Sequence, residues 1–127
     1  DGKPVLSCLE LAAECEGRSI ETVEGMMQGN ELHPLQSCFA DLGAAQCGYC
    51  TPGILLAAQA LLAENDSPTR DQIVEALSGN LCRCTGYHKI LEAIEWAAAQ
   101  LRGDDQYQPP DSAIYGDPLP GKQAADV

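Results

Sequence analysis

Basic residues are scarce in this chain. Seven Lys and Arg stand against 19 Asp and Glu, which gives a formal net charge of −12 over 127 residues. A surface with this charge repels the phosphate backbones of nucleic acids and the anionic surfaces of membranes. We therefore expect no nucleic-acid partner.

Long hydrophobic runs are also missing. The longest, residues 54–63, contains Gln59 and is about half of the ~20 residues that an α-helix needs to cross a bilayer. The first residues lack the basic and then apolar pattern of a secretory signal. We expect a cytoplasmic protein with no membrane span.

Histidine is almost as rare, with only His33 and His88. A Rieske-type cluster needs two histidines on one iron, and neither of these lies where it would replace a cysteine. The sequence also shows no Ser/His/Asp constellation, no phosphate-binding loop and no paired acids. We therefore expect no catalytic residues in this chain.

Cysteine is the feature that the chain does have. Four of its seven cysteines form two short clusters, Cys47-Gly48-Tyr49-Cys50 and Cys82-Arg83-Cys84, which are separated by the 31 residues 51–81. Each cluster projects two thiols from one tight turn. If folding brings the two turns together, they supply the four sulfurs that a [2Fe–2S] cluster or a tetrahedral zinc requires.

Several kinds of protein fit four cysteines. A structural zinc or protein-interaction module is one alternative, although zinc sites usually repeat C-x2-C over a shorter interval. An iron–sulfur sensor or assembly scaffold is another, and it would hold an exposed, labile cluster. A disulfide framework fits less well, because seven cysteines leave one unpaired.

The hydrophobic pattern predicts a mainly α fold. Helices are expected over about residues 34–43, 51–64, 69–79 and 87–101, with Pro34 in the first turn of the first, Thr51 as the N-cap of the second and a capping box at Thr69 and Gln72 opening the third. The first and fourth helices should each place apolar residues on one face, which are Leu35, Cys38, Phe39 and Leu42 in the first and Tyr87, Ile90, Leu91, Ile94, Ala98 and Leu101 in the fourth. The second is apolar on most sides and is expected to be the buried central helix, while the third would bury Ile73, Val74 and Leu77. Short connections predict a four-helix bundle with both cysteine pairs at helix N-termini, where the partial positive charge favours thiolates.

The two ends of the chain differ from the middle. Residues 5–8 and 18–23 are expected to be extended, the latter as an alternating strand. Residues 104–127 hold four of the eight prolines and are expected to form an extended tail or linker, with Tyr107, Ile114 and Tyr115 as possible anchors.

The cysteine motifs lie within longer sequences, QCGYCTPG at residues 46–53 and GNLCRCTGY at residues 79–87. With TVEG at residues 22–25 and HPLQ at residues 33–36, they resemble the iron–sulfur subunit of the molybdenum hydroxylases. This is the family of xanthine dehydrogenase, aldehyde oxidoreductase and carbon monoxide dehydrogenase. The resemblance covers residues 1 to about 101.

The resemblance implies a role in electron transfer. Residues 26–103 would form the bundle that holds one [2Fe–2S] cluster through Cys47, Cys50, Cys82 and Cys84. Gln46 and Cys84 would lie near a molybdopterin in a partner subunit or domain. Electrons would pass from that centre toward a second cluster and then to FAD in a further partner or to an external acceptor.

The start of the chain departs from the family pattern. Cys8 resembles the fourth ligand of a plant-type ferredoxin domain of the β-grasp type, but the C-x4-C-x2-C ligands are absent. Residues 1–25 are thus expected to be the remnant of that domain, and Cys8 to be a ligand only if residues outside this chain complete the second cluster. Cys15 and Cys38 match no ligand motif and are expected to be small buried residues.

Overall fold

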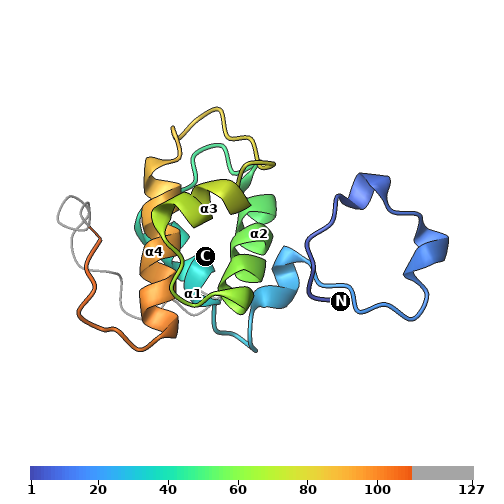
Figure 1. Ribbon diagram of the computed structural model, residues 1–127, viewed down its shortest axis with the longest axis horizontal. Coiled ribbons are helices and arrows are strands. Elements are labelled where there is room, and N and C mark those ends of the chain that lie inside the picture. Colours follow the sequence, from blue (N-terminus) through green and yellow to red (C-terminus); the bar gives the residue numbers. More distant parts are fainter. Residues whose placement is uncertain (110–127) are drawn as a thin grey trace.

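The computed structural model describes residues 1–109 and is mainly helical, as predicted (Figure 1). Its α-helices are α1 (Pro34–Asp41), α2 (Thr51–Glu64), α3 (Arg70–Ala76) and α4 (His88–Leu101). Three short 3-10 helices precede them: η1 (Ser7–Leu9), η2 (Ala12–Cys15) and η3 (Val23–Met26). The described part of the chain contains no sheet, and none of its helices has the length and hydrophobicity to cross a membrane.

The four α-helices enclose a single hydrophobic core. Helix α4 packs against α1 and α3, and α2 packs against the same two helices. Tyr107, which follows α4, also packs on this core, so the first predicted anchor of the tail is confirmed. The other two, Ile114 and Tyr115, lie outside the described residues.

Helix α1 begins where predicted, and a capping box explains its start. The N–H of Leu35 donates to Nδ1 of His33 at 3.2 Å, and Oε1 of Gln36 accepts from the N–H of His33 at 3.0 Å. The helix ends before Gly43, whose φ of +61° suits glycine. The predicted core face is confirmed, because all four of its members are buried: Leu35, Cys38, Phe39 and Leu42.

Protonation of His33 is expected to destabilise the fold, since Nδ1 can accept the cap hydrogen bond only when it is unprotonated. Burial lowers the pKa of His33 below its ordinary 6.5, against the opposing effect of Glu21. The unfolded chain therefore binds the proton more tightly, and the free energy of unfolding should fall as the pH drops below 6.5. The loss should reach at most about 1 kcal/mol, a typical N-cap contribution.

Urea unfolding on both sides of that pH measures the effect. His33→Asn keeps a side-chain acceptor at the cap and has no titrating group, so it should remove this part of the pH dependence. The same pH dependence in that variant would contradict the assignment to His33.

Helix α2 has the predicted bounds but not the predicted burial. Only Ile54, Leu55 and Ala58 are buried, so the expectation that α2 is the central helix is wrong. The long apolar pattern misleads because much of it is alanine and leucine that are only half-buried, among them Leu56 and Leu61, which pack at the edge of the core. Helix α4 holds most of the core instead, with these residues buried: Ile90, Leu91, Glu92, Ala93, Ile94, Trp96, Ala97, Ala98 and Ala99.

The N-cap of α2 is Cys50, so the prediction that Thr51 occupies this position is wrong by one residue. No side chain accepts a hydrogen bond at this cap. The N-terminal N–H groups of α2 are therefore not satisfied by a capping side chain, and the first cysteine pair ends at that helix terminus.

Helix α3 starts at the predicted capping box. The N–H of Gln72 donates to Oγ1 of Thr69 at 3.3 Å, and the N–H of Thr69 donates to Oε1 of Gln72 at 2.8 Å. The helix ends at Ala76, a few residues before the predicted end. Val74 is 50% exposed, so its predicted burial is wrong, whereas Ile73 and Leu77 are buried as expected.

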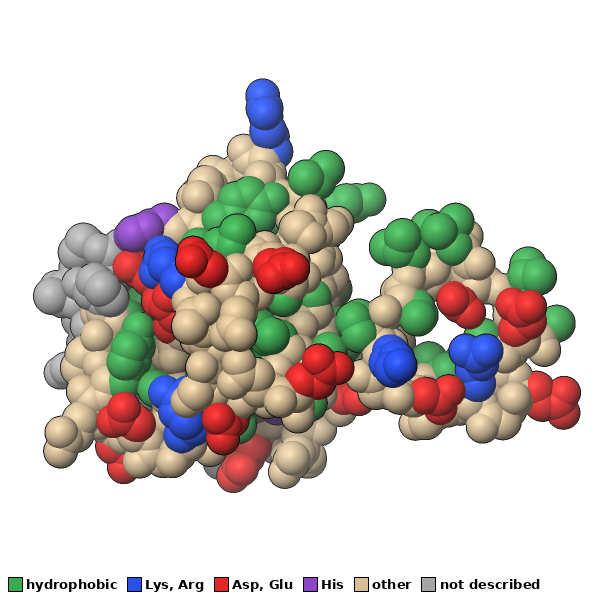
Figure 2. All heavy atoms as spheres, in the orientation of Figure 1, with side chains coloured by type: hydrophobic (Ala, Val, Ile, Leu, Met, Phe, Trp, Pro, Cys, Tyr) green, Lys and Arg blue, Asp and Glu red, His purple; other side chains and the backbone are tan. Residues whose placement is uncertain are grey.

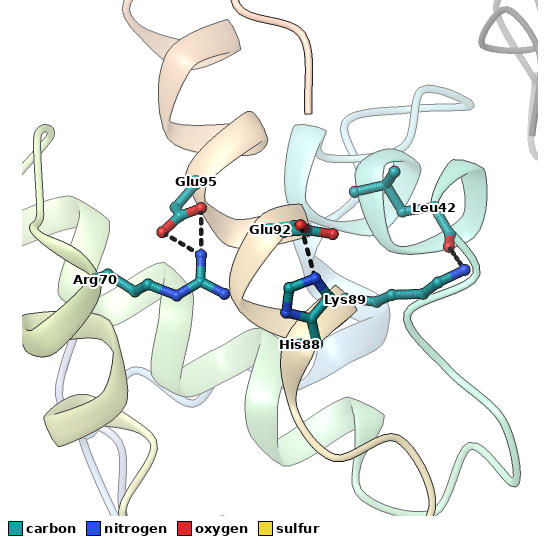
Figure 3. Close-up of polar contacts among 6 residues, drawn as sticks. All are labelled: Leu42, Arg70, His88, Lys89, Glu92 and Glu95. Carbon is teal, nitrogen blue, oxygen red and sulfur yellow. Dashed lines mark hydrogen bonds and ion pairs between the residues drawn. The ribbon is translucent and has the colours of Figure 1, made fainter. Parts of the chain in front are cut away.

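Two polar contacts connect α4 to its neighbours (Figure 3). Nη1 of Arg70 in α3 lies 3.0 Å from both carboxylate oxygens of Glu95 in α4. Nζ of Lys89 donates to the carbonyl oxygen of Leu42, just after α1, at 3.2 Å. Both contacts hold α4 in register with the helices on either side of it.

Helix α4 also carries a buried carboxylate (Figure 3). Glu92 is 1% exposed, and its Oε1 lies 3.1 Å from Nε2 of His88 one turn earlier. Its Oε2 has no hydrogen-bond partner among the described residues. A half-satisfied carboxylate is costly to bury, so apolar packing of α4 must offset this cost.

The predicted strands near the N-terminus do not form. Cys8 lies in η1, and residues 18–22 have no regular secondary structure. Residues 1–20 form a loop that projects from the helices, with hydrophobic side chains on its outside (Figures 1 and 2). The exposed ones are Val5, Leu6, Leu9, Leu11 and Ile20.

The projecting loop joins the helices at η3. Met26 is buried in the core, and Nε2 of Gln36 in α1 donates to the carbonyl oxygen of Val23 at 3.2 Å. Nε2 of Gln59 in α2 donates to Oε1 of Glu21 at 3.0 Å. The chain is thus attached to the helices from about residue 21 onward.

Candidate metal centre

The two cysteine pairs lie in loops at the same end of the four helices (Figure 1). One loop, residues 43–50, leads into α2, and the other, residues 77–87, leads into α4. Gly53, in the first turn of α2, lies against the second loop: a Cβ at this position would be 2.8 Å from Nδ2 of Asn80. The second cysteine loop therefore packs on the helix that the first loop starts.

The four thiols meet as two pairs, each with one sulfur from either loop. Cys47 and Cys84 lie close enough for each thiol to shift the pKa of the other, and the thiol of Cys82 likewise acts on that of Cys50. The charge of Cys82 also acts on Cys47 and on Cys84. The structure thus brings together all four cysteines that the sequence singled out.

Hydrogen-bond donors favour the thiolate form of two of these cysteines. The backbone N–H of Tyr49 lowers the pKa of Cys47. The hydroxyl of Thr85, with the backbone N–H groups of Thr85 and Cys84, lowers the pKa of Cys82 to about 7. Donors of this kind stabilise negative charge on sulfur, which is what a metal ligand requires.

The other two thiols have raised pKa values. Burial, followed by the neighbouring thiol of Cys82, raises the pKa of Cys50 to about 11. The hydrogen bond with Cys47 raises the pKa of Cys84. In each pair one sulfur therefore gives up its proton more readily than its partner, and a bound cation would be needed to deprotonate all four together.

Thr85 and Tyr87 hold the second loop in place, a role that the helical pattern did not indicate. Oγ1 of Thr85 lies 3.1 Å from Sγ of Cys82. The phenol oxygen of Tyr87 accepts from the N–H of Cys82 at 2.7 Å and donates to the carbonyl oxygen of Asn80 at 2.9 Å. Tyr87 was predicted only as an apolar member of α4, but its φ of +66° places it before the helix.

The donor set fits a [2Fe–2S] cluster, which is held by four thiolates, two on each iron. Two pairs of sulfurs side by side match that division. The described residues contain no group of three or more His, Cys, Asp or Glu placed around a single metal ion.

The fold and the cysteine loops have counterparts in known proteins. Residues 22–95 match the family described as "[2Fe-2S] binding domain". The chain belongs to this family. It is 54% identical over 101 residues to the nicotine 6-hydroxylase small subunit of Paenarthrobacter nicotinovorans, covering 80% of this chain and 61% of that protein.

Two further relatives are the iron–sulfur-binding subunit of xanthine dehydrogenase and an aldehyde oxidoreductase. The first, from Escherichia coli O157:H7, is 47% identical over 96 residues, or 74% of this chain and 60% of that subunit. The solved structure of the second, from Desulfovibrio gigas, is 36% identical with a TM-score of 0.79, and the match covers 92% of this chain and 13% of that one. The resemblance to the molybdenum hydroxylase family is thereby confirmed.

The chain spans only part of these relatives. It covers between 59% and 62% of the first curated proteins that it matches. The matches therefore concern the [2Fe–2S] binding domain and its surroundings.

The structure places the remaining candidate residues as follows. Gln46 is exposed in the first loop, directly before Cys47. Cys8 is exposed in the projecting loop, which contains none of the four central cysteines. Cys38 is buried as predicted, and burial raises its pKa to about 12, whereas the prediction that Cys15 is buried is wrong because it is half-exposed.

Proposed function

We propose that this chain is the electron-transfer module of a molybdenum hydroxylase. Cys47, Cys50, Cys82 and Cys84 are its four ligands for one [2Fe–2S] cluster, and the four α-helices form the bundle that supports it. When bound, the cluster accepts and releases one electron at a time. The meeting of four thiols from two remote loops is the observation that carries this proposal.

The protein side chains have two tasks in this proposal. The donors around Cys47 and Cys82 keep sulfur negative, and the start of α2 adds the partial positive charge of a helix N-terminus next to Cys50. Core packing keeps water away from Cys50, which lies against the buried cluster of side chains. Both features favour an anionic cofactor that changes its charge without large movements of the protein.

Gln46 and Cys84 form the side of the module that faces molybdopterin in this proposal. Both residues are exposed, in adjacent loops at the same end of the helices. The molybdopterin would belong to a large partner subunit or domain, where a substrate would be hydroxylated. An FAD-binding partner or an external acceptor would receive the electrons.

Residues 1–25 are proposed to be the end of a ferredoxin-like domain whose other parts lie outside this chain. Their exposed apolar side chains and their lack of strand pairing fit a segment that packs on further protein. Cys8 would then complete a second [2Fe–2S] cluster with three cysteines from that protein. Seven unpaired cysteines suit the cytoplasm, where thiols stay reduced.

Metal and sulfide analysis tests this function. The full chain, purified without oxygen, should contain about two irons and about two acid-labile sulfides per molecule, absorb visible light, and give a paramagnetic signal on reduction. Cys8→Ala should leave these values unchanged, because Cys8 alone cannot hold a cluster. A colourless protein with one zinc per chain would instead show a structural zinc module.

A further inference from the structure

The hydroxyl of Thr85 lies within hydrogen-bond distance of a cysteine sulfur. Its Oγ1 is 3.1 Å from Sγ of Cys82. In a metal-free thiol either atom can be the donor. A cysteine that binds iron has lost its proton, so in the loaded protein only the hydroxyl can donate.

The backbone of Tyr87 fixes the direction of that hydroxyl. The N–H of Tyr87 donates to Oγ1 of Thr85 at 3.2 Å. This contact occupies a lone pair of the oxygen and leaves its hydrogen available for the sulfur. The left-handed conformation of Tyr87, at φ +66°, accompanies this contact.

The phenol of Tyr87 holds the other end of the same loop. Its oxygen accepts from the N–H of Cys82 at 2.7 Å and donates to the carbonyl oxygen of Asn80 at 2.9 Å. Tyr87 thus contacts the backbone of Cys82 through its side chain and Thr85 through its main chain. The result is a chain of hydrogen bonds that runs from the N–H of Tyr87 to the hydroxyl of Thr85 and on to the sulfur of Cys82. Each bond in this chain polarises the next.

We propose that Thr85 sets the reduction potential of the cluster by donating its hydroxyl hydrogen to the sulfur of Cys82, with Tyr87 as the residue that positions it. This inference rests on the proposed ligand role of Cys82. A hydrogen bond to a ligating sulfur draws negative charge away from the iron, which stabilises the reduced form and raises the potential. Thr85 is therefore a tuning residue and not a ligand.

Thr85→Val tests the proposal, because valine keeps the branched shape and lacks the hydroxyl. The complete protein should still bind iron and sulfide, but its midpoint potential, from a redox titration followed by EPR, should be lower. We expect about a tenfold smaller ratio of reduced to oxidised cluster at a fixed potential, which is about 59 mV for a one-electron couple. Thr85→Ser restores a hydroxyl and should return the potential close to that of the wild type.

Thr51→Val is the matched control. Thr51 follows Cys50 directly, and its hydroxyl makes no hydrogen bond to sulfur in the described part of the chain. The same substitution there should leave the potential unchanged. Tyr87→Phe removes the phenol contacts to the loop and should shift the potential and broaden the EPR signal while Thr85 is intact.

Two results would overturn the inference. One is a loaded Thr85→Val protein with the wild-type potential. The other is loss of the cluster from both Thr85→Val and Thr85→Ala, since the residue would then be needed for assembly and not for tuning. Either result differs from a failure of the proposed function, in which the wild-type protein itself would contain no iron and no sulfide.

Discussion

Cys50→Ala is expected to remove the [2Fe–2S] cluster from this protein. Cys50 is the N-cap of α2 and packs against the hydrophobic core, so its sulfur has a fixed position at the start of the helix. Three thiolates leave one iron with an open position. Bound iron and visible absorbance should fall by about tenfold or more, and the EPR signal of the reduced cluster should disappear.

Cys15→Ala is the control for this experiment. Cys15 lies in η2, in the projecting loop, and its Sγ donates to the carbonyl oxygen of Leu11 at 3.6 Å. This variant should keep its iron, sulfide and spectrum. An undiminished cluster in Cys50→Ala, or equal losses in both variants, would contradict the proposed ligand set.

Ile94→Ala is expected to destabilise the protein strongly. Ile94 is 0% exposed on α4, the helix that contributes most of the core. Removing buried methyl and methylene groups costs their transfer free energy and leaves a cavity, so the free energy of unfolding should fall by about 2–5 kcal/mol. Urea unfolding of the loaded protein, followed by the helical circular dichroism signal, measures this change.

Leu101→Ala is the matched change on the same helix. Leu101 is 48% exposed at the end of α4, although the sequence pattern placed it on the buried stripe. Its loss should cost only about 0.5 kcal/mol, as for most surface substitutions. Similar costs at both positions would show that α4 is not the central helix.

The sequence predicted much of the helical part of the fold correctly. Pro34 and the residues around it indicated the start of α1, and the Thr69 capping box indicated that of α3, because both signals depend on local contacts within one turn. The cysteine spacing also predicted which four thiols would meet. Short-range chemistry and a specific motif sufficed for these features.

Features that depend on packing between distant segments were predicted less well. Counting apolar residues made α2 the central helix, because a run of alanine and leucine is apolar on most sides and does not tell which side of the helix is covered. The predicted burial of Val74 was wrong for a related reason. A seven-residue helix has too few turns for its sequence to show which face is buried. The predicted N-terminal strands do not form, because a strand needs a partner and no segment in the described residues provides one.

Thr85 and Tyr87 were missed for a different reason. Their roles rest on a single positive φ and on hydrogen bonds within one irregular loop, which hydrophobic periodicity does not detect. A threonine directly after the second cysteine pair, followed by glycine and tyrosine, was the available signal. It indicated a tight turn, but not which atom the hydroxyl would contact.

The four sulfurs differ in exposure, so one side of the site is open and the other is covered by the helices. Cys47 and Cys84 are exposed, whereas Cys50 and Cys82 are half-buried against the helices. Electron tunnelling slows steeply with distance, so a redox group docked over the open side could exchange electrons quickly with a cofactor held between these sulfurs. Under the proposed function, a route through the opposite side would have to cross the packed helices, so the fold would favour electron exchange at the open side.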